Sequence, residues 1–138
     1  MKAYTDIEQS KKLAEILPLE SADMTLPFRH TKDDKYLPGY VGARSYIDVY
    51  NDMIVLPGMD KEEVCKLIQP CWSLAALFSA LPEYIKFDGH TWKFYNDHYG
   101  VYYMNADTYD TNTFSTNSEN LVDACYKMII KLHELNLL

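Results

Sequence analysis

The stretch that decides the fold is Pro70-Cys71-Trp72-Ser73-Leu74-Ala75-Ala76-Leu77-Phe78-Ser79-Ala80-Leu81-Pro82. Ser73 is a residue type that caps helix N-termini, and Pro82 cannot continue a helix. The sequence therefore predicts a short apolar helix over residues 74–81. Because so short a helix is not stable alone, Cys71 and Trp72 at its entrance are expected to be buried with it.

The residues after this helix predict an antiparallel meander. The aromatic runs 84–87 and 90–95 flank Asp88-Gly89, a pair typical of tight hairpin turns because both central residues of such a turn have positive φ. A second turn at Asn96-Asp97 leads into a third strand that ends near Met104. Residues 113–115 are expected to form a short edge strand.

The C-terminal segment has the periodicity of an amphipathic helix, which we expect to be capped by Ser118 or Asn117 and to pack on the meander. Its apolar residues recur at spacings of three and four: Leu121, Cys125, Met128, Leu132 and Leu135, with Val122 and Ile129 beside them.

The N-terminal segment is predicted to begin with a helix that ends near Leu17 and is followed by Pro18. Thr5 and Glu8 have the spacing of a capping box, in which each side chain bonds to a backbone N–H of the first turn. Residues 21–24 are expected to form one further helical turn.

The region from residue 25 to residue 69 has weaker signals. Residues 25–42 contain Pro and Gly among polar residues and are predicted to be a loop with an extended piece. Residues 43–56 mix β-branched and aromatic residues, which favours one or two strands. Asp60 is expected to cap a short helix that contains Val64 and Leu67.

Together these elements predict an α+β fold with a single domain over residues 1–138. An antiparallel β-meander is packed by the C-terminal amphipathic helix and by shorter helices. Most of the core is expected to come from Trp72, Leu74, Leu77, Phe78, Leu81, Ile85, Phe87, Trp92, Phe94, Leu121, Val122, Cys125, Met128, Ile129 and Leu132.

Composition excludes several classes of function. The net charge is −7 and both halves of the chain are acidic, so direct nucleic-acid binding is not expected. No apolar run approaches the ~20 residues that a membrane-spanning helix needs. The chain has three cysteines, which is an odd number, and no secretory leader is expected. These features predict reduced thiols and a cytoplasmic protein.

Four motifs resemble a family of small proteins carried on bacteriophages and integrated mobile elements of gut bacteria. They are Tyr4-Thr5-x-x-Glu8-Gln9-Ser10, Ser21-Ala22-Asp23-Met24, Pro70-Cys71-Trp72-Ser73-Leu74 and Asn120-Leu121-Val122-Asp123-Ala124. The motifs are spread over most of the chain but leave residues 25–69 uncovered. The family has no assigned activity, cofactor or catalytic residue. The resemblance implies an uncharacterised, cytoplasmic accessory protein of a phage or prophage.

Cys71 is the candidate nucleophile for an enzymatic function. A cysteine just ahead of a helix can have its thiolate stabilised by the helix dipole, and His90 or His98 could act as its base. Cys-Trp at a helix start loosely resembles the nucleophile position of papain-like peptidases, although the glycine-containing stretch before that cysteine is missing. The alternative, which we favour, is that Cys71 packs in the core and is inert.

No metal or cofactor is predicted. His90 and His98 lie near Asp88, Asp97, Asp107 and Asp110, but aspartate is common in turns for conformational reasons. No pair of histidines has the spacing that places both on one face of a helix.

The tyrosines of the predicted meander are candidates for a surface that binds a partner. Tyrosine packs well on a half-exposed sheet face and is enriched in protein interfaces. The candidates are Tyr95, Tyr99, Tyr102 and Tyr103. Since one face of the meander takes the helix, about half of the aromatic residues should be core.

Three hypotheses for function remain. The first is a small, non-enzymatic phage or prophage accessory protein that binds another, unidentified protein. The second is a cysteine-dependent hydrolase that uses Cys71 with His90 or His98, so the sequence does not decide whether the chain is an enzyme. The third is an acidic DNA-mimic inhibitor. A weak homodimer is also expected, through the edge at residues 113–115 or through the aromatic sheet face.

Overall fold

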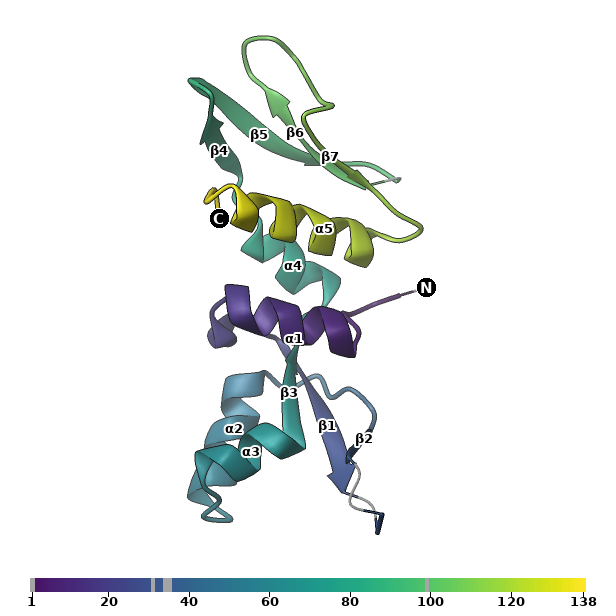
Figure 1. Cartoon of the computed structure of the whole chain (residues 1–138), viewed down its shortest axis with the longest axis vertical. Coiled ribbons are helices and arrows are strands. Elements are labelled where there is room, and N and C mark those ends of the chain that lie inside the picture. Colours follow the sequence, from purple (N-terminus) through teal and green to yellow (C-terminus); the bar gives the residue numbers. More distant parts are fainter. Residues whose placement is uncertain (1, 31, 34–35, 99) are drawn as a thin grey trace. The chain divides into compact units, whose positions relative to one another are not determined.

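A computed structural model describes residues 2–30, 32–33, 36–98 and 100–138, and it confirms the α+β class. The described residues form five α-helices, one short 3-10 helix and two antiparallel sheets (Figure 1). They cluster into an N-terminal unit, Tyr4–Ala76, and a C-terminal unit made of residues 2–3 with Leu77–Leu138. Within the described ranges, no helix is both long and apolar enough to cross a bilayer.

The N-terminal unit is built on a three-stranded antiparallel sheet with the order β2-β1-β3. The strands are β1 (Met24–His30), β2 (Tyr36–Pro38) and β3 (Ile68–Cys71), and Met24 pairs with Cys71 in the register. The helices are α1 (Ile7–Ile16), η1 (Leu19–Ser21), α2 (Tyr46–Val55) and α3 (Lys61–Leu67). The core of this unit contains Leu13, Ala22, Leu26, Tyr46, Val64, Ile68, Cys71 and Trp72.

The first helix is confirmed, but its capping residue is Asp6 and not Thr5. Asp6 accepts a hydrogen bond from the N–H of Gln9, and the side chain of Gln9 accepts one from the N–H of Asp6. Thr5 is buried and is already hydrogen-bonded elsewhere. The capping box is therefore shifted by one residue from the predicted position.

The strands predicted over residues 43–56 are wrong, because this segment contains α2. Ser45 caps the helix by accepting a hydrogen bond from the N–H of Asp48. Within the helix, Tyr46 and Tyr50 are one turn apart, and the centroids of their rings lie 6.0 Å from each other. β-branched and aromatic residues favour strands only weakly. Here the N-cap at Ser45 and the burial of Tyr46 stabilise a helix instead.

The loop predicted over residues 25–42 contains two strands, β1 and β2. The predicted helical turn at residues 21–24 is also displaced, since η1 ends at Ser21 and Met24 begins β1. β1 forms because it pairs with β3, more than 40 positions along the chain, and local sequence does not reveal that pairing. The predicted helix after Asp60 is confirmed as α3, with Asp60 accepting from the N–H of Glu63.

The helix in the fold-deciding stretch is confirmed as α4 (Leu74–Ala80), and the boundary between the two units falls within it. Ser73 accepts a hydrogen bond from the N–H of Ala76, as expected of an N-cap. Cys71 and Trp72 are both fully buried. The predicted burial at the helix entrance is thus confirmed.

The C-terminal unit contains the predicted meander, extended by one strand. Its sheet has the order β4-β5-β6-β7, with β4 (Tyr84–Phe87), β5 (His90–Asn96), β6 (Gly100–Asn105) and β7 (Phe114–Asn117). Asp88 and Gly89 have φ values of 54° and 76°, which confirms the tight turn. The predicted edge strand is confirmed as β7.

Helix α5 (Leu121–Glu134) packs against β6 and β7 and covers one face of this sheet, as Figure 1 shows. Its cap is Asn120, which accepts from the N–H of Asp123, and neither predicted candidate fills this position. Ten of the predicted core residues are buried: Trp72, Leu77, Leu81, Ile85, Trp92, Val122, Cys125, Met128, Ile129 and Leu132. The other five are half-buried: Leu74, Phe78, Phe87, Phe94 and Leu121.

Candidate functional site

The four-stranded sheet has two faces of different chemistry, because successive side chains on a strand point to opposite sides. The face that α5 covers is the inner face. Its aromatic side chains meet edge to face around Phe114, with ring centroids 5.0 Å away at Trp92 and 5.1 Å away at Phe87. This face is the hydrophobic core of the unit.

The opposite side of the sheet, which we call the outer face, is the candidate functional site. Register and alternation place ten strand positions on it: Tyr84, Lys86, Thr91, Lys93, Tyr95, Gly100, Tyr102, Met104, Ser115 and Asn117. Lys86 and Lys93 are basic, and none of the ten is a carboxylate. The strand positions of the outer face therefore carry positive charge in a chain of net charge −7.

The tyrosines of the outer face form an ordered row. Tyr95 and Tyr102 are directly opposite each other on β5 and β6, and their rings stack with centroids 5.7 Å apart and an angle of 17° between planes. The ammonium group of Lys93 lies 5.6 Å from the centroid of the Tyr95 ring and 5.9 Å from that of Tyr84. Cation–π and stacking contacts hold these side chains in place, so the row is partly ordered before any partner arrives.

The structure sorts the four tyrosines that the sequence suggested. Tyr95 and Tyr102 lie on the outer face and are half-buried by their mutual contact. Tyr103 is fully buried on the inner face, where its hydroxyl group donates to the carbonyl oxygen of Pro82 at 2.6 Å, so including it in a partner surface was wrong. Tyr99 lies outside the described residues.

The outer face also contains residues that the sequence analysis did not select, namely Tyr84, Lys86, Lys93 and Met104. The alternation of side chains along the strands of the predicted hairpin could have identified them. Tyr84 and Lys93, for example, are cross-strand neighbours in that hairpin and therefore share a face. Tyr84 is the most accessible ring of the row, with 53% of its surface exposed.

Cys71 does not have the environment of a nucleophile. Its thiol is fully buried, donates to the carbonyl oxygen of Thr5 at 3.4 Å and lies 3.6 Å from the Thr5 hydroxyl oxygen. Burial raises the pKa of the Cys71 thiol, although hydrogen bonds with Thr5 and Ser10 act in the opposite direction. A neutral, inaccessible thiol is a poor nucleophile.

The two histidines proposed as bases, His90 and His98, belong to the C-terminal unit, whereas Cys71 belongs to the N-terminal unit. His90 Nδ1 lies 2.7 Å from a carboxylate oxygen of Asp107, and His98 is exposed after β5. The contact between His90 and Asp107 is the shortest histidine–carboxylate contact in the described ranges. Among the same residues, no three His, Cys, Asp or Glu side chains lie close enough together to share a metal ion.

Cavities in the N-terminal unit offer less chemistry than the outer face. A hollow of about 380 Å³ opens beside the start of α1. Its acidic residues are Asp6, which caps α1, and Glu8. Its other lining residues are Tyr4, Thr5, Ile7, Leu26, Gly39 and Val41, which bring no further titratable group apart from the Tyr4 hydroxyl.

The chain matches no protein-family model, and searches of curated proteins and of solved structures return no match either. The class of protein is therefore defined by its own geometry: an α+β chain whose four-stranded sheet leaves an ordered tyrosine and lysine face uncovered by its helix.

Proposed function

We propose that the protein is a non-enzymatic binding module that recognises another protein through the outer face of its four-stranded sheet. The observation that carries this proposal is the ordered row of Tyr84, Lys93, Tyr95 and Tyr102 on a face without carboxylates. Tyrosine supplies a large contact area with few rotatable bonds, and interfaces are enriched in it.

The composition of the outer face favours a protein partner over a single-stranded nucleic acid. Platforms that stack nucleobases combine aromatic rings with a strongly basic groove. The outer face has two lysines, Lys86 and Lys93. The other two lysines of this region, Lys127 and Lys131, donate to main-chain carbonyl groups beside β7 and are not part of the outer face.

The biological setting is part of the same proposal. The sequence motifs described above resemble those of small proteins carried on phages and mobile elements. We place the module accordingly, as a cytoplasmic accessory protein of a phage or prophage whose partner is a protein of the infected or lysogenic cell.

Selection of binders from a library of random short peptides tests the proposal without knowledge of the host. Peptides that bind the wild-type protein should bind Tyr102→Ser about tenfold or more weakly, since truncating a central aromatic contact removes on the order of 1.4 kcal/mol or more. Tyr40→Ser is the matched control, because Tyr40 is fully exposed on the other unit. Circular dichroism establishes that both variants remain folded.

Two results contradict the proposal. One is that no peptide is enriched on the wild-type protein. The other is that enriched peptides bind Tyr102→Ser and Tyr95→Ser as tightly as they bind the wild type.

A further inference from the structure

The first strand of the four-stranded sheet, β4, has one edge paired with β5 and one edge open. Phe87 and His90 flank the two-residue turn, and such a flanking pair exchanges backbone hydrogen bonds that then recur at every second residue. The bond from the N–H of Phe94 to the carbonyl of Glu83, at 2.9 Å, continues this alternation. The N–H and C=O groups of Tyr84 and Lys86 therefore point to the open edge.

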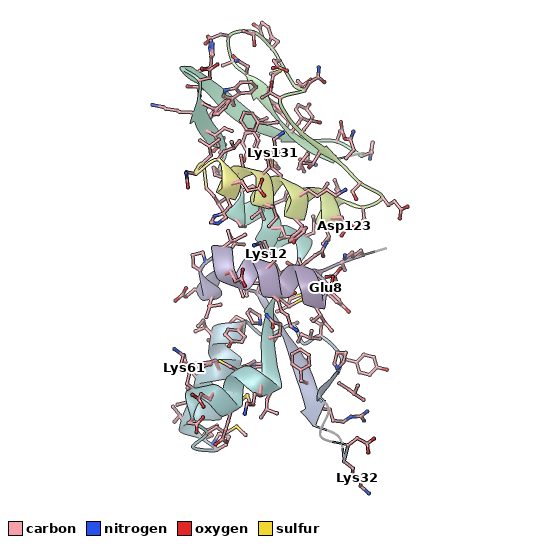
Figure 2. All side chains as sticks on the ribbon, viewed as in Figure 1. Glu8, Lys12, Lys32, Lys61, Asp123 and Lys131 are labelled. Carbon is pink, nitrogen blue, oxygen red and sulfur yellow. The ribbon has the colours of Figure 1, made fainter. Side chains whose placement is uncertain are left out.

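At the other edge of the sheet, two lysines are bonded to backbone carbonyl groups. Lys131, labelled in Figure 2, extends from α5 and donates to the carbonyl of Thr113 just before β7. Lys127 donates to the carbonyl of Asn117 at its end, 3.4 Å away. No described side chain makes a comparable bond to the backbone of Tyr84 or Lys86. An open edge with unsatisfied backbone groups is a template for an added strand, and among the described residues no lysine is bonded to the outward backbone groups of β4.

The charges beside β4 determine which kind of segment could pair with this strand. Lys86 lies opposite Thr91, so Lys93 is its diagonal neighbour on the outer face. Within the described part of the chain, neither lysine forms an ion pair. Within the described ranges β4 itself has no carboxylate: Glu83 and Asp88 lie just beyond its ends, and the Asp107 carboxylate is bonded to His90, which pairs with Phe87. A segment paired with β4 would thus meet positive charge at its centre.

We propose that the partner bound by the outer face contributes an extended acidic segment, which pairs with β4 as a fifth strand of the sheet. The proposal rests on the binding function proposed above. The added strand places a carboxylate beside Lys86 and an aromatic or β-branched side chain beside Tyr84, so that the tyrosine row continues onto the partner. Backbone pairing supplies the geometry, and Lys86 with Lys93 supplies the preference for acidic sequences.

The substitution Lys86→Pro separates edge pairing from contact with the face. Proline lacks an N–H, but at residue 86 that N–H faces the open edge, so the bonds between β4 and β5 remain. Ser115→Pro is the matched control. The backbone groups of every second residue of β7 point away from β6, as those of Thr113 and Asn117 do, so the N–H of Ser115 also faces the open edge of β7. Lys86→Ala removes the charge and keeps the N–H.

The probe is the pool of peptides selected on the wild-type protein, resynthesised with and without methyl groups on alternate backbone nitrogens. We expect the pool to be enriched in Asp and Glu. Lys86→Pro and one of the two N-methylation patterns should each weaken binding about tenfold or more, whereas Ser115→Pro should leave it unchanged. Lys86→Ala should weaken binding and reduce its dependence on salt. Hydrogen exchange at the amides of Tyr84 and Lys86 should slow when a peptide is bound.

The outcomes distinguish this inference from the proposed function. If the selected peptides require Tyr102 but tolerate Lys86→Pro and both methylation patterns, the face binds a partner without adding a strand and the inference is wrong. A pool without acidic enrichment also overturns it. If Lys86→Ala leaves peptide binding unchanged and instead promotes self-association, Lys86 protects the edge from pairing and the inference fails.

Discussion

The main-chain carbonyl of Thr5 accepts a hydrogen bond from the thiol of Cys71 at 3.4 Å, and the Thr5 hydroxyl oxygen lies 3.2 Å from the backbone N–H of Trp72. The N–H of Thr5 in turn donates to the carbonyl of Trp72. The residue that looked like a helix cap therefore fastens the chain ahead of α1 to the end of β3. The same contacts enclose Cys71 in the core.

Native protein should be alkylated by iodoacetamide at Cys65 and not at Cys71. Cys65 is exposed, whereas Cys71 is buried and burial raises its pKa, so little accessible thiolate is present below pH 8. Mass spectrometry of peptides from protein labelled before and after unfolding measures both sites. Rapid native labelling of Cys71 would revive the hydrolase hypothesis.

Cys71→Ala should lower the free energy of unfolding by about 1–3 kcal/mol, because it removes a packed sulfur atom and its bonds with Thr5. Urea denaturation measures the loss. Cys65→Ala is the control and should change stability by less than about 0.5 kcal/mol, as exposed positions usually do. A Cys71→Ala variant as stable as the wild type would mean that Cys71 does not serve the core.

The cap of α1 gives a second test. Asp6→Ala should destabilise the protein by about 1 kcal/mol, since it removes the bond to the N–H of Gln9. Gln9→Ala, which removes the reciprocal bond, should also destabilise it, whereas Glu8→Ala should cost only a few tenths of a kcal/mol. If Glu8→Ala were the more damaging change, Thr5 and Glu8 would form the box after all.

The elements that the sequence predicts well are those determined by local chemistry. The Asp88-Gly89 turn, the Ser73 cap and the spacing of α5 each require only neighbouring residues. The pairing of Met24 with Cys71 is long-range and leaves no local trace, so the sequence predicts a loop with an extended piece over residues 25–42 and not the two paired strands β1 and β2. The composition of α2 predicts strands, but the N-cap at Ser45 and the burial of Tyr46 outweigh that preference.

The same distinction applies to the candidate site. Alternation along β6 could have separated Tyr102 from Tyr103, because neighbouring residues of a strand point to opposite faces. Which of the two faces the helix would cover could not be known from periodicity alone. That choice is made by packing around Phe114, where rings from β4, β5 and β6 converge.

Gly100→Ala should destabilise the C-terminal unit by at least about 2–3 kcal/mol. A Cβ atom at residue 100 would overlap the carbonyl oxygen of Thr116 on the adjacent strand, and a backbone atom of a paired strand cannot move aside cheaply. Gly42→Ala is the control, because its Cβ atom would lie 3.9 Å from the Thr25 carbonyl oxygen, an ordinary contact. Denaturation followed by circular dichroism compares the two variants. Equal stability would contradict the close approach of β6 and β7.

Stability should fall as the pH rises above about 9, and Cys125 should contribute to the fall. Burial raises the pKa of the Cys125 thiol to about 12, from an ordinary value of 9.0. Below about pH 8 the thiol is almost fully protonated in both states, so it adds little pH dependence. Between about pH 9 and 12 the unfolded chain loses this proton and the folded chain keeps it, so unfolding becomes more favourable by about 1.4 kcal/mol per pH unit.

Cys125→Ala isolates that contribution because it removes the titrating group. The variant should be less stable than the wild type near pH 7, where a buried side chain has been truncated, yet its stability should depend less steeply on pH between about 9 and 10. The comparison is confined to that interval because two tyrosine hydroxyl groups add their own dependence above pH 10. They are Tyr46, with a pKa raised to about 12 mainly by burial, and Tyr103, whose pKa is raised by burial and by the charge of Cys125. Urea denaturation at closely spaced pH values measures both slopes. Parallel slopes for the two proteins would show that the Cys125 thiol ionises as readily in the folded chain as in the unfolded one, which is incompatible with its position beneath the four-stranded sheet.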